Sequence, residues 1–275
     1  MTETPTVPAG ATTTQEPVLQ VEGATKLYGG VAAVQDISFA VYPGEILGLI
    51  GPNGAGKTTL VNLITGTTPA SRGTIRFKGR SLRGLPPHVI GSQGIARTFQ
   101  VVRPFQNLTV LENVAVGAMY GRGGHRRTAA AAFAHAAEVL QVVDLSRQAH
   151  LLAESLPIAG RKRLELAKAL AMDPELLLLD EAMAGLRGRE IDEAMALIQR
   201  INGTGVTILV IEHVMKVIQG VCHRVVVLDY GRKIAEGPPA AVMQDPAVIE
   251  AYLGQRYART LAQQDGPGEG SGGDE

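Results

Sequence analysis

The sequence predicts an α/β fold built on a mainly parallel β-sheet that helices cover on both faces. Two observations lead to this prediction. Short apolar runs, such as ELLLLDE at 175–181 and GVTILVIEH at 205–213, alternate with amphipathic helical stretches such as EIDEAMALIQRI at 190–201. Strands that are apolar on both faces are typical of parallel sheets, whose faces are both buried under helices. The 33 glycines and a hydrophobic fraction of 45% fit a protein with many loops around a large core.

The hydrophobic pattern also predicts the order of the elements. In the first half of the chain we expect strands at 18–30 and 31–45, a buried strand at 45–51, a short helix at 57–66, an edge strand at 73–79, a strand near the core at 94–100 and helices from 108 to about 143. In the second half we expect a helix at 161–170, a strand at 175–181, a helix at 190–201, strands at 205–213, 223–231 and 232–237, and a helical end.

The chain is expected to form one domain at 17–255, with an inserted helical lobe at about 101–172. Residues 1–16 have neither a basic start nor an apolar run, so they predict a disordered tail rather than a signal peptide. Residues 256–275 are rich in glycine and acidic residues and predict a flexible tail. No internal repeat with a fixed period is present.

Charge and cysteine content exclude several classes of protein. The chain has 26 Lys and Arg residues against 26 Asp and Glu residues, so its formal net charge is zero. A general nucleic-acid binder needs a basic surplus, so no nucleic-acid partner is expected. Cys222 is the single cysteine, which excludes a disulfide framework within one chain. No run approaches the roughly 18 to 20 apolar residues that cross a bilayer.

The strongest motif is GPNGAGKTT at 51–59, which matches the P-loop pattern and stands between a predicted strand and a predicted helix. Its glycines let backbone N–H groups surround phosphates, and the helix N-terminus favours negative charge. Lys57 would reach the β- and γ-phosphates of ATP, and the Thr58 hydroxyl would bind Mg²⁺. The nucleotide-binding residues expected here are Gly51, Asn53, Gly54, Gly56, Lys57, Thr58 and Thr59. The alternative is a chance glycine-rich turn, which the strand–loop–helix context disfavours.

A second motif is LLLLDE at 176–181, an apolar strand that ends in two carboxylates. The strand end places Asp180 at the carboxyl edge of the sheet, beside the phosphate loop, where it can hold Mg²⁺ through water. Glu181 can polarise the attacking water. A strand followed by an acidic helix start would look the same, but its separation from the P-loop favours the functional interpretation.

Three further residues are weaker candidates. His213 follows the apolar strand in VIEHVM and could hydrogen-bond the γ-phosphate, although a histidine at a strand end is more often structural. Gln100 ends ARTFQ and could reach the metal or the water. Tyr28 in KLYGG could stack on an adenine ring, although a core or edge tyrosine is the commoner case.

Taken together and in this order, the P-loop, Gln100, a loop before a basic helix, LLLLDE and His213 resemble the ATP-binding subunit of ABC transporters. The resemblance covers about 18–254. It implies a P-loop NTPase fold with an antiparallel β subdomain and an inserted α-helical subdomain. The stretches LYGGVAAVQDISF, ARTFQ, LENVAVG, IEHVM and VIEAYLG resemble more narrowly the ATPases of branched-chain amino acid importers, and importers of amides and short-chain solutes share them.

The resemblance also identifies LPIAG at 156–160, a loop expected before the helix at 161–170. The signature of this family, L-S-G-G-Q, begins 24 residues before the metal-binding aspartate, and counting back from Asp180 reaches Leu156. Pro157 therefore stands in place of the serine, Ile158 and Ala159 in place of the glycines, and Gly160 in place of the glutamine. In the family this segment touches the γ-phosphate bound by the other subunit, and Pro157 offers neither a hydroxyl nor an N–H. Arg187 and Ala182 also depart from the family pattern.

The function that the resemblance implies is an ATPase that uses ATP and Mg²⁺ to drive solute import. The expected partners are a second ABC ATPase subunit, identical or different, two membrane permease subunits and, indirectly, an extracytoplasmic solute-binding protein. The expected location is the cytoplasmic face of the membrane. Two alternatives remain: a nucleotide-binding regulatory subunit with little turnover, which the altered signature favours, and a soluble ABC ATPase outside transport. Soluble ABC ATPases usually carry a second nucleotide domain, a long coiled coil or a zinc-binding cysteine pair. This sequence shows none of the three, which disfavours that alternative.

Overall fold

A computed structural model describes residues 15–99, 104–122 and 128–253. Its larger sheet has six strands in the order β10-β9-β3-β8-β7-β6. Five of them run parallel, namely β3 (Ile46–Ile50), β6 (Ile95–Arg97), β7 (Leu176–Asp180), β8 (Thr207–Ile211) and β9 (Arg224–Asp229), and β10 (Arg232–Gly237) pairs antiparallel to β9. Every residue of β3, β7 and β8 is buried, which is why these strands are apolar apart from Asp180 at the end of β7 and Thr207 at the start of β8.

The smaller sheet is antiparallel, with the order β2-β1-β4-β5. Its strands are β1 (Leu19–Tyr28), β2 (Val31–Val41), β4 (Arg72–Phe77) and the two-residue β5 (Arg80–Ser81). One expectation about an edge is wrong. The strand expected at the edge, β4, lies inside this sheet because β5 pairs with its outer side. The strand expected near the core, β6, does lie there, with Ile95 and Ala96 buried, and it is at the same time an edge strand of the larger sheet.

The six-stranded sheet separates two cores. On one face, α1 (Lys57–Ile64) lies between the two sheets, and Leu60 and Val61 pack in the same cluster as Leu176 and Leu178 of β7. On the other face, Leu177 and Leu179 of β7 pack with α6 (Arg189–Asn202) and α7 (Met215–Val221). The leucines of β7 therefore pack alternately into the cores on the two faces of the sheet.

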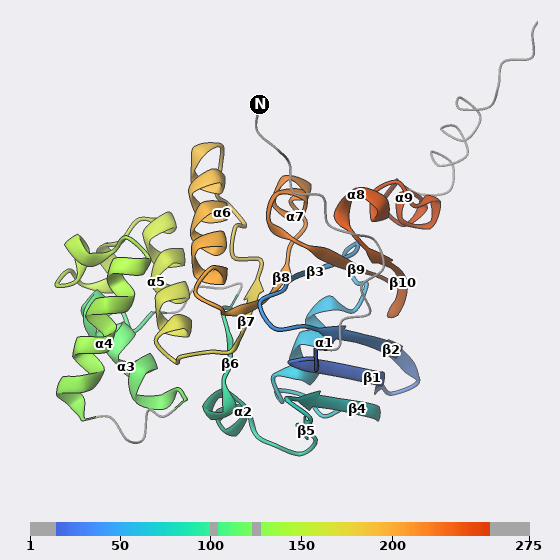
Figure 1. The fold of residues 1–275 in the computed structure, drawn as a ribbon, viewed down its shortest axis with the longest axis horizontal. Coiled ribbons are helices and arrows are strands. Elements are labelled where there is room, and N and C mark those ends of the chain that lie inside the picture. The colour runs from blue at the N-terminus through green and yellow to red at the C-terminus, as the bar shows by residue number, and fades with distance from the viewer. Residues whose placement is uncertain (1–14, 100–103, 123–127, 254–275) are drawn as a thin grey trace, which may run out of the picture.

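Three helices form a group at one end of the molecule, beside β6 (Figure 1). They are α3 (Val110–Tyr120), α4 (Ala129–Val142) and α5 (Ile158–Leu170), and α3 packs against both of the others. A capping box formed by Thr109 and Glu112 begins α3, and the Thr128 hydroxyl caps α4. This group lies within the range predicted for the helical lobe, whose limits remain a prediction.

The remaining helices are short. The helix α2 (Pro87–Gln93) was not expected from the sequence, because it has Gly91 and Ser92 inside it and spans only 7 residues. The chain continues after β10 with α8 (Pro239–Val242) and α9 (Pro246–Leu253). Short 3₁₀ turns at 146–148 and 153–155 lead into α5. Among the described helices, none is long and apolar enough to cross a membrane.

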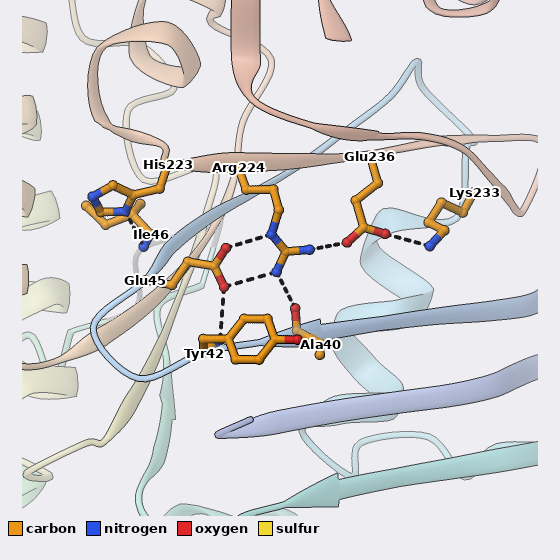
Figure 2. Close-up of polar contacts among 8 residues, drawn as sticks. All are labelled: Ala40, Tyr42, Glu45, Ile46, His223, Arg224, Lys233 and Glu236. Atoms are coloured by element: carbon orange, nitrogen blue, oxygen red, sulfur yellow. Dashed lines mark hydrogen bonds and ion pairs between the residues drawn. The ribbon is translucent and has the colours of Figure 1, made fainter. Parts of the chain in front are cut away.

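A half-buried ionic network ties the start of β3 to the β9–β10 hairpin (Figure 2). The Arg224 guanidinium donates to both carboxylate oxygens of Glu45, from Nε to Oε1 at 2.8 Å and from Nη2 to Oε2 at 3.0 Å. Its Nη2 also donates to the Ala40 carbonyl at 2.6 Å. It also pairs with Glu236, which accepts a second bond from Lys233. The network therefore links the end of β2, the turn before β3 and both strands of the hairpin.

We expect Arg224→Met to lower the free energy of unfolding by about 2 kcal/mol, because it leaves the half-buried Glu45 carboxylate without its cation, whereas Glu236 keeps Lys233. Urea denaturation of the two proteins measures this difference. Arg232→Met is the matched control, since Arg232 lies on the same hairpin and bonds only to exposed Gln35 among the described residues. The control is expected to change stability by no more than about 0.5 kcal/mol. A similar small loss for both variants would contradict the structural role of the network.

Candidate nucleotide site

The P-loop follows β3 and leads into α1, as the motif predicts. Two of its glycines have positive φ in places where no side chain fits. A Cβ on Gly51, at φ 148°, would lie 2.1 Å from the Leu228 carbonyl oxygen, and one on Gly56, at φ 100°, would lie 2.6 Å from the Ala33 carbonyl oxygen. The loop is therefore held against β9 and β2. Its tip, with Asn53 and Gly54, is exposed.

Lys57 opens α1 and folds back over the loop. Its Nζ donates to the Gly51 carbonyl at 2.6 Å and to the Pro52 carbonyl at 3.0 Å. Burial lowers the pKa of Lys57, and the charges of Glu181 and Asp180 act in the opposite direction. The structure thus brings the P-loop lysine into the same electrostatic environment as the two carboxylates of LLLLDE. Thr58, the next residue, is exposed, and Thr59 is half-buried.

Asp180 ends β7 and is only 5% exposed. Its Oδ2 accepts a charged hydrogen bond from Arg97 Nη2 at 2.6 Å, and its backbone N–H donates to Thr98 Oγ1 at 3.2 Å. The other terminal nitrogen of Arg97 donates to Asn62 Oδ1 on α1 at 2.7 Å. Sequence reasoning missed Arg97, and the only signal was a cation in ARTFQ, close to the motif that supplied Gln100.

Glu181 has a left-handed backbone conformation, with φ 48°. Such a conformation costs of order 1 kcal/mol or more in a residue other than glycine and is common at functional sites. Backbone hydrogen bonds hold it, and one of them is donated by the Ala184 N–H to the Glu181 carbonyl at 3.1 Å. The Glu181 N–H donates to the Ile211 carbonyl at 2.9 Å, and its carbonyl accepts from Lys162 Nζ at 3.3 Å, which also reaches the Ala182 carbonyl at 3.1 Å. Sequence reasoning missed this role for Lys162 in α5.

His213 follows β8 and is exposed. Because β8 pairs in parallel with β7, with Ile211 opposite Asp180, His213 lies at the same edge of the sheet as the carboxylates. The residue before it, Glu212, is 1% exposed, and its Oε1 accepts the Met183 N–H at 2.9 Å. Burial raises the pKa of Glu212. This carboxyl, also missed from the sequence, connects the loop after β7 to the loop after β8.

Tyr28 ends β1 and is 51% exposed, with Lys26 Nζ 5.0 Å from its ring centre. The neighbouring strand β2 touches the P-loop through Ala33, so the β1–β2 hairpin flanks the loop. This position leaves the ring accessible for stacking. Gln100 lies outside the described residues.

We expect Tyr28→Ala to weaken ATP and ADP binding equally, by about 1 kcal/mol each, because stacking touches only the base. Fluorescence titration with both nucleotides measures the two affinities. Tyr230→Ala is the control, since this side chain is exposed at the β9–β10 turn. A loss confined to ATP would contradict an adenine contact.

The segment that aligns with the signature differs from the expected loop. The helix α5 begins at Ile158 rather than at Arg161, so Ile158, Ala159 and Gly160 form its first turn. Pro157 occupies the N-cap position and supplies no side-chain hydrogen bond. Leu156 is buried, whereas Ile158 is 68% exposed. The altered residues therefore form a helix N-terminus without a side-chain cap, and the exposed, apolar Ile158 is its first residue.

The residues proposed for Mg²⁺ fit that ion. The described residues contain no group of three or more His, Cys, Asp or Glu side chains that could form an all-protein metal site. Asp180 and the Thr58 hydroxyl line one groove together. One carboxylate and one hydroxyl suit Mg²⁺, which keeps several waters and binds phosphate oxygens rather than filling its shell with protein ligands.

This chain is similar to known proteins over most of its length. The ABC transporter family matches residues 34–184, and the branched-chain amino acid ATP-binding cassette transporter family matches residues 232–258. The high-affinity branched-chain amino acid transport ATP-binding protein BraF of Pseudomonas aeruginosa is 37% identical over 87% of this chain and 98% of its own length. The corresponding protein LivG of Escherichia coli is 38% identical over 87% of this chain and 99% of its own.

Solved structures agree with these matches. The crystal structure of a nucleotide-free ATP-binding cassette from an ABC transporter has a TM-score of 0.79 and 28% sequence identity, and the alignment covers 87% of this chain and 100% of the other. The ADP conformation of an ATP-binding cassette from an ABC transporter gives the same values. The similarity therefore extends over most of the chain.

Proposed function

The chain belongs to the ABC transporter family of ATP-binding proteins, and from that premise we propose that it powers the import of branched-chain amino acids through membrane permeases. As a member of this family it binds and hydrolyses ATP. The observation that carries the proposal is the convergence of Lys57, Asp180 and Glu181 at one sheet edge, in a chain that matches branched-chain amino acid transport ATPases over nearly their full length.

In the proposed site the P-loop N–H groups and Lys57 hold the ATP phosphates, and Tyr28 stacks on the adenine. Thr58, Asp180 and Gln100 hold Mg²⁺, which when bound neutralises charge on the phosphates. Glu181 accepts the proton of the attacking water and orients it, and His213 donates a hydrogen bond to the γ-phosphate. The hydrogen bond that the Glu181 N–H donates to the Ile211 carbonyl, and the one that the Glu181 carbonyl accepts from Lys162, hold the backbone from which its carboxylate projects.

The permease subunits are proposed to dock on the aromatic side of the groove between the sheet and the helical group, whose other side is lined by Thr58 and Asp180. Phe99, Phe105 and Tyr120 line it and are exposed, and the half-buried Lys168 lines it too. Exposed aromatic side chains in a hollow are typical of protein–protein interfaces. A chain docked in this way works from the cytoplasmic face of the membrane, with the solute-binding protein on the other side.

Transport assays test the proposal. The chain is combined with its permease subunits, its partner ATPase and the solute-binding protein in proteoliposomes, and uptake of labelled leucine is measured with ATP inside or absent. Leucine uptake that requires ATP is expected. Uptake of a short-chain amide without uptake of leucine would show that the transporter imports amides or short-chain solutes and not branched-chain amino acids. Absence of ATP hydrolysis by the complete assembly would favour the regulatory alternative, which the apolar start of α5 supports.

The altered signature predicts two unequal ATP sites if the partner ATPase carries an intact one. ATP bound at Lys57 would face the partner's signature, whereas ATP on the partner would face Pro157 and Ile158. Loss of one transition-state donor costs roughly 10²–10³ in rate. Glu181→Gln is therefore expected to remove most steady-state ATPase activity of the transporter, and the matching change in the partner much less. Equal losses would show that the backbone N–H groups of the first turn of α5 replace the missing contacts.

A further inference from the structure

Arg97 makes a connection within the nucleotide site that neither the motifs nor the family matches assign. Its side chain is 11% exposed and bridges two elements, with Nη2 on Asp180 Oδ2 and Nη1 on Asn62 Oδ1. The residue itself ends β6, the strand that pairs with β7. One guanidinium thus joins the P-loop helix, the strand that carries Asp180 and the strand that leads to Gln100.

The geometry is that of a positioning group. A guanidinium that only neutralised a carboxylate would be expected to pair side by side with both oxygens. Here its two terminal nitrogens go to different partners, and the hydrogen bonds within the described residues engage only Oδ2 of Asp180. The Phe99 ring covers the guanidinium, 5.2 Å from centroid to Cζ. Asn62 and Phe99 therefore hold Arg97 in place, and Arg97 in turn fixes the rotation of the Asp180 carboxylate.

We propose that Arg97 is a positioning residue that fixes one oxygen of Asp180, leaves the other for Mg²⁺, and lowers the attraction of the carboxylate for the ion. The inference rests on the proposed function, since it takes Asp180 as a metal-binding residue. The second effect is electrostatic: a positive charge 2.6 Å from Asp180 in a mostly buried site opposes a divalent cation on the same carboxylate. Arg97 thereby favours release of the ion after turnover at the expense of affinity.

The test separates metal affinity from turnover. Mn²⁺ is titrated into the full chain with ADP and followed by electron paramagnetic resonance. In Arg97→Gln, which keeps a polar side chain but loses the charge, Mn²⁺ is expected to bind about tenfold more tightly. ATP hydrolysis at saturating metal is expected to fall about tenfold, because the carboxylate is no longer held. A side chain needed only for folding would weaken both.

Two further variants distinguish the effect of the Arg97 charge from the effect of its fixed position. Arg97→Lys keeps the cation, so its Mn²⁺ affinity should stay within about threefold of wild type. Asn62→Ala keeps the charge and frees the guanidinium, so hydrolysis should fall while Mn²⁺ affinity stays within the same range. Arg122→Gln is the matched control, since it removes a cation from an ion pair with Glu175 outside the site, and both readouts should be unchanged.

Each outcome decides the question. Unchanged or weaker Mn²⁺ binding by folded Arg97→Gln overturns the proposal, and if that variant does not fold, full activity of Asn62→Ala overturns it. Failure of the wild-type chain to bind Mn²⁺ with nucleotide is a different result, because it removes the proposed metal site itself and not only the role of Arg97.

Discussion

Replacing Glu181 by glutamine is expected to leave ATP bound while lowering its hydrolysis by at least about 10²-fold. The amide has nearly the same shape, but it cannot accept the proton of the attacking water. The backbone contacts that hold residue 181, from Ile211 and Lys162, do not involve the side chain, so the loop keeps its conformation. Binding and chemistry should therefore separate cleanly.

Two measurements check this expectation: equilibrium binding of a fluorescent ATP analogue and release of phosphate at saturating ATP. Glu22→Gln is the control, because this exposed side chain on β1 makes its contacts away from the P-loop. Hydrolysis at the wild-type rate in Glu181→Gln would move the catalytic base to another residue.

Lys57→Ala is expected to weaken ATP binding by about 100-fold or more, since a charged hydrogen bond in a half-buried site contributes about 1.5–3 kcal/mol and Lys57 would make more than one. It is the lysine of the motif, and its Nζ already lies against the loop carbonyls of Gly51 and Pro52. Isothermal titration calorimetry measures the loss. Lys78→Ala, which removes a surface ion pair with Glu175, should bind ATP normally. An unchanged affinity in Lys57→Ala would show that the loop is not the phosphate site.

The sequence predicted the parts of the fold and the site that depend on local pattern. The strands β7 and β8 are apolar apart from Asp180 and Thr207 because both faces are buried, so their sequence alone defines them. Lys57, Asp180 and Glu181 come from motifs whose spacing carries the chemistry. The start of α5 was misplaced by three residues, because proline at the N-cap and glycine in the first turn read as a loop.

The parts that could not be predicted depend on contacts between distant segments. Whether β4 or β6 is an edge strand depends on which other strand pairs with it, and β5 has only two residues to indicate this. Arg97 and Asp180 are 83 residues apart in the chain, and only the pairing of β6 with β7 brings them together. Glu212 and Lys162 were missed for the same reason: each acts on a backbone group of the loop after β7.

The strand order has a consequence for the synthesis of this protein. The strand before the P-loop, β3, pairs on one side with β8, where Ile46 lies opposite Ile208, and on the other with β9, where Leu47 lies opposite Arg224. Both partners emerge from the ribosome long after β3 itself. Until then the nascent chain carries a fully apolar strand with two open edges, which is a form prone to aggregation. A polypeptide interrupted before residue 207 therefore cannot assemble the phosphate loop, and ATP, by binding only the completed sheet, stabilises chains that have finished folding.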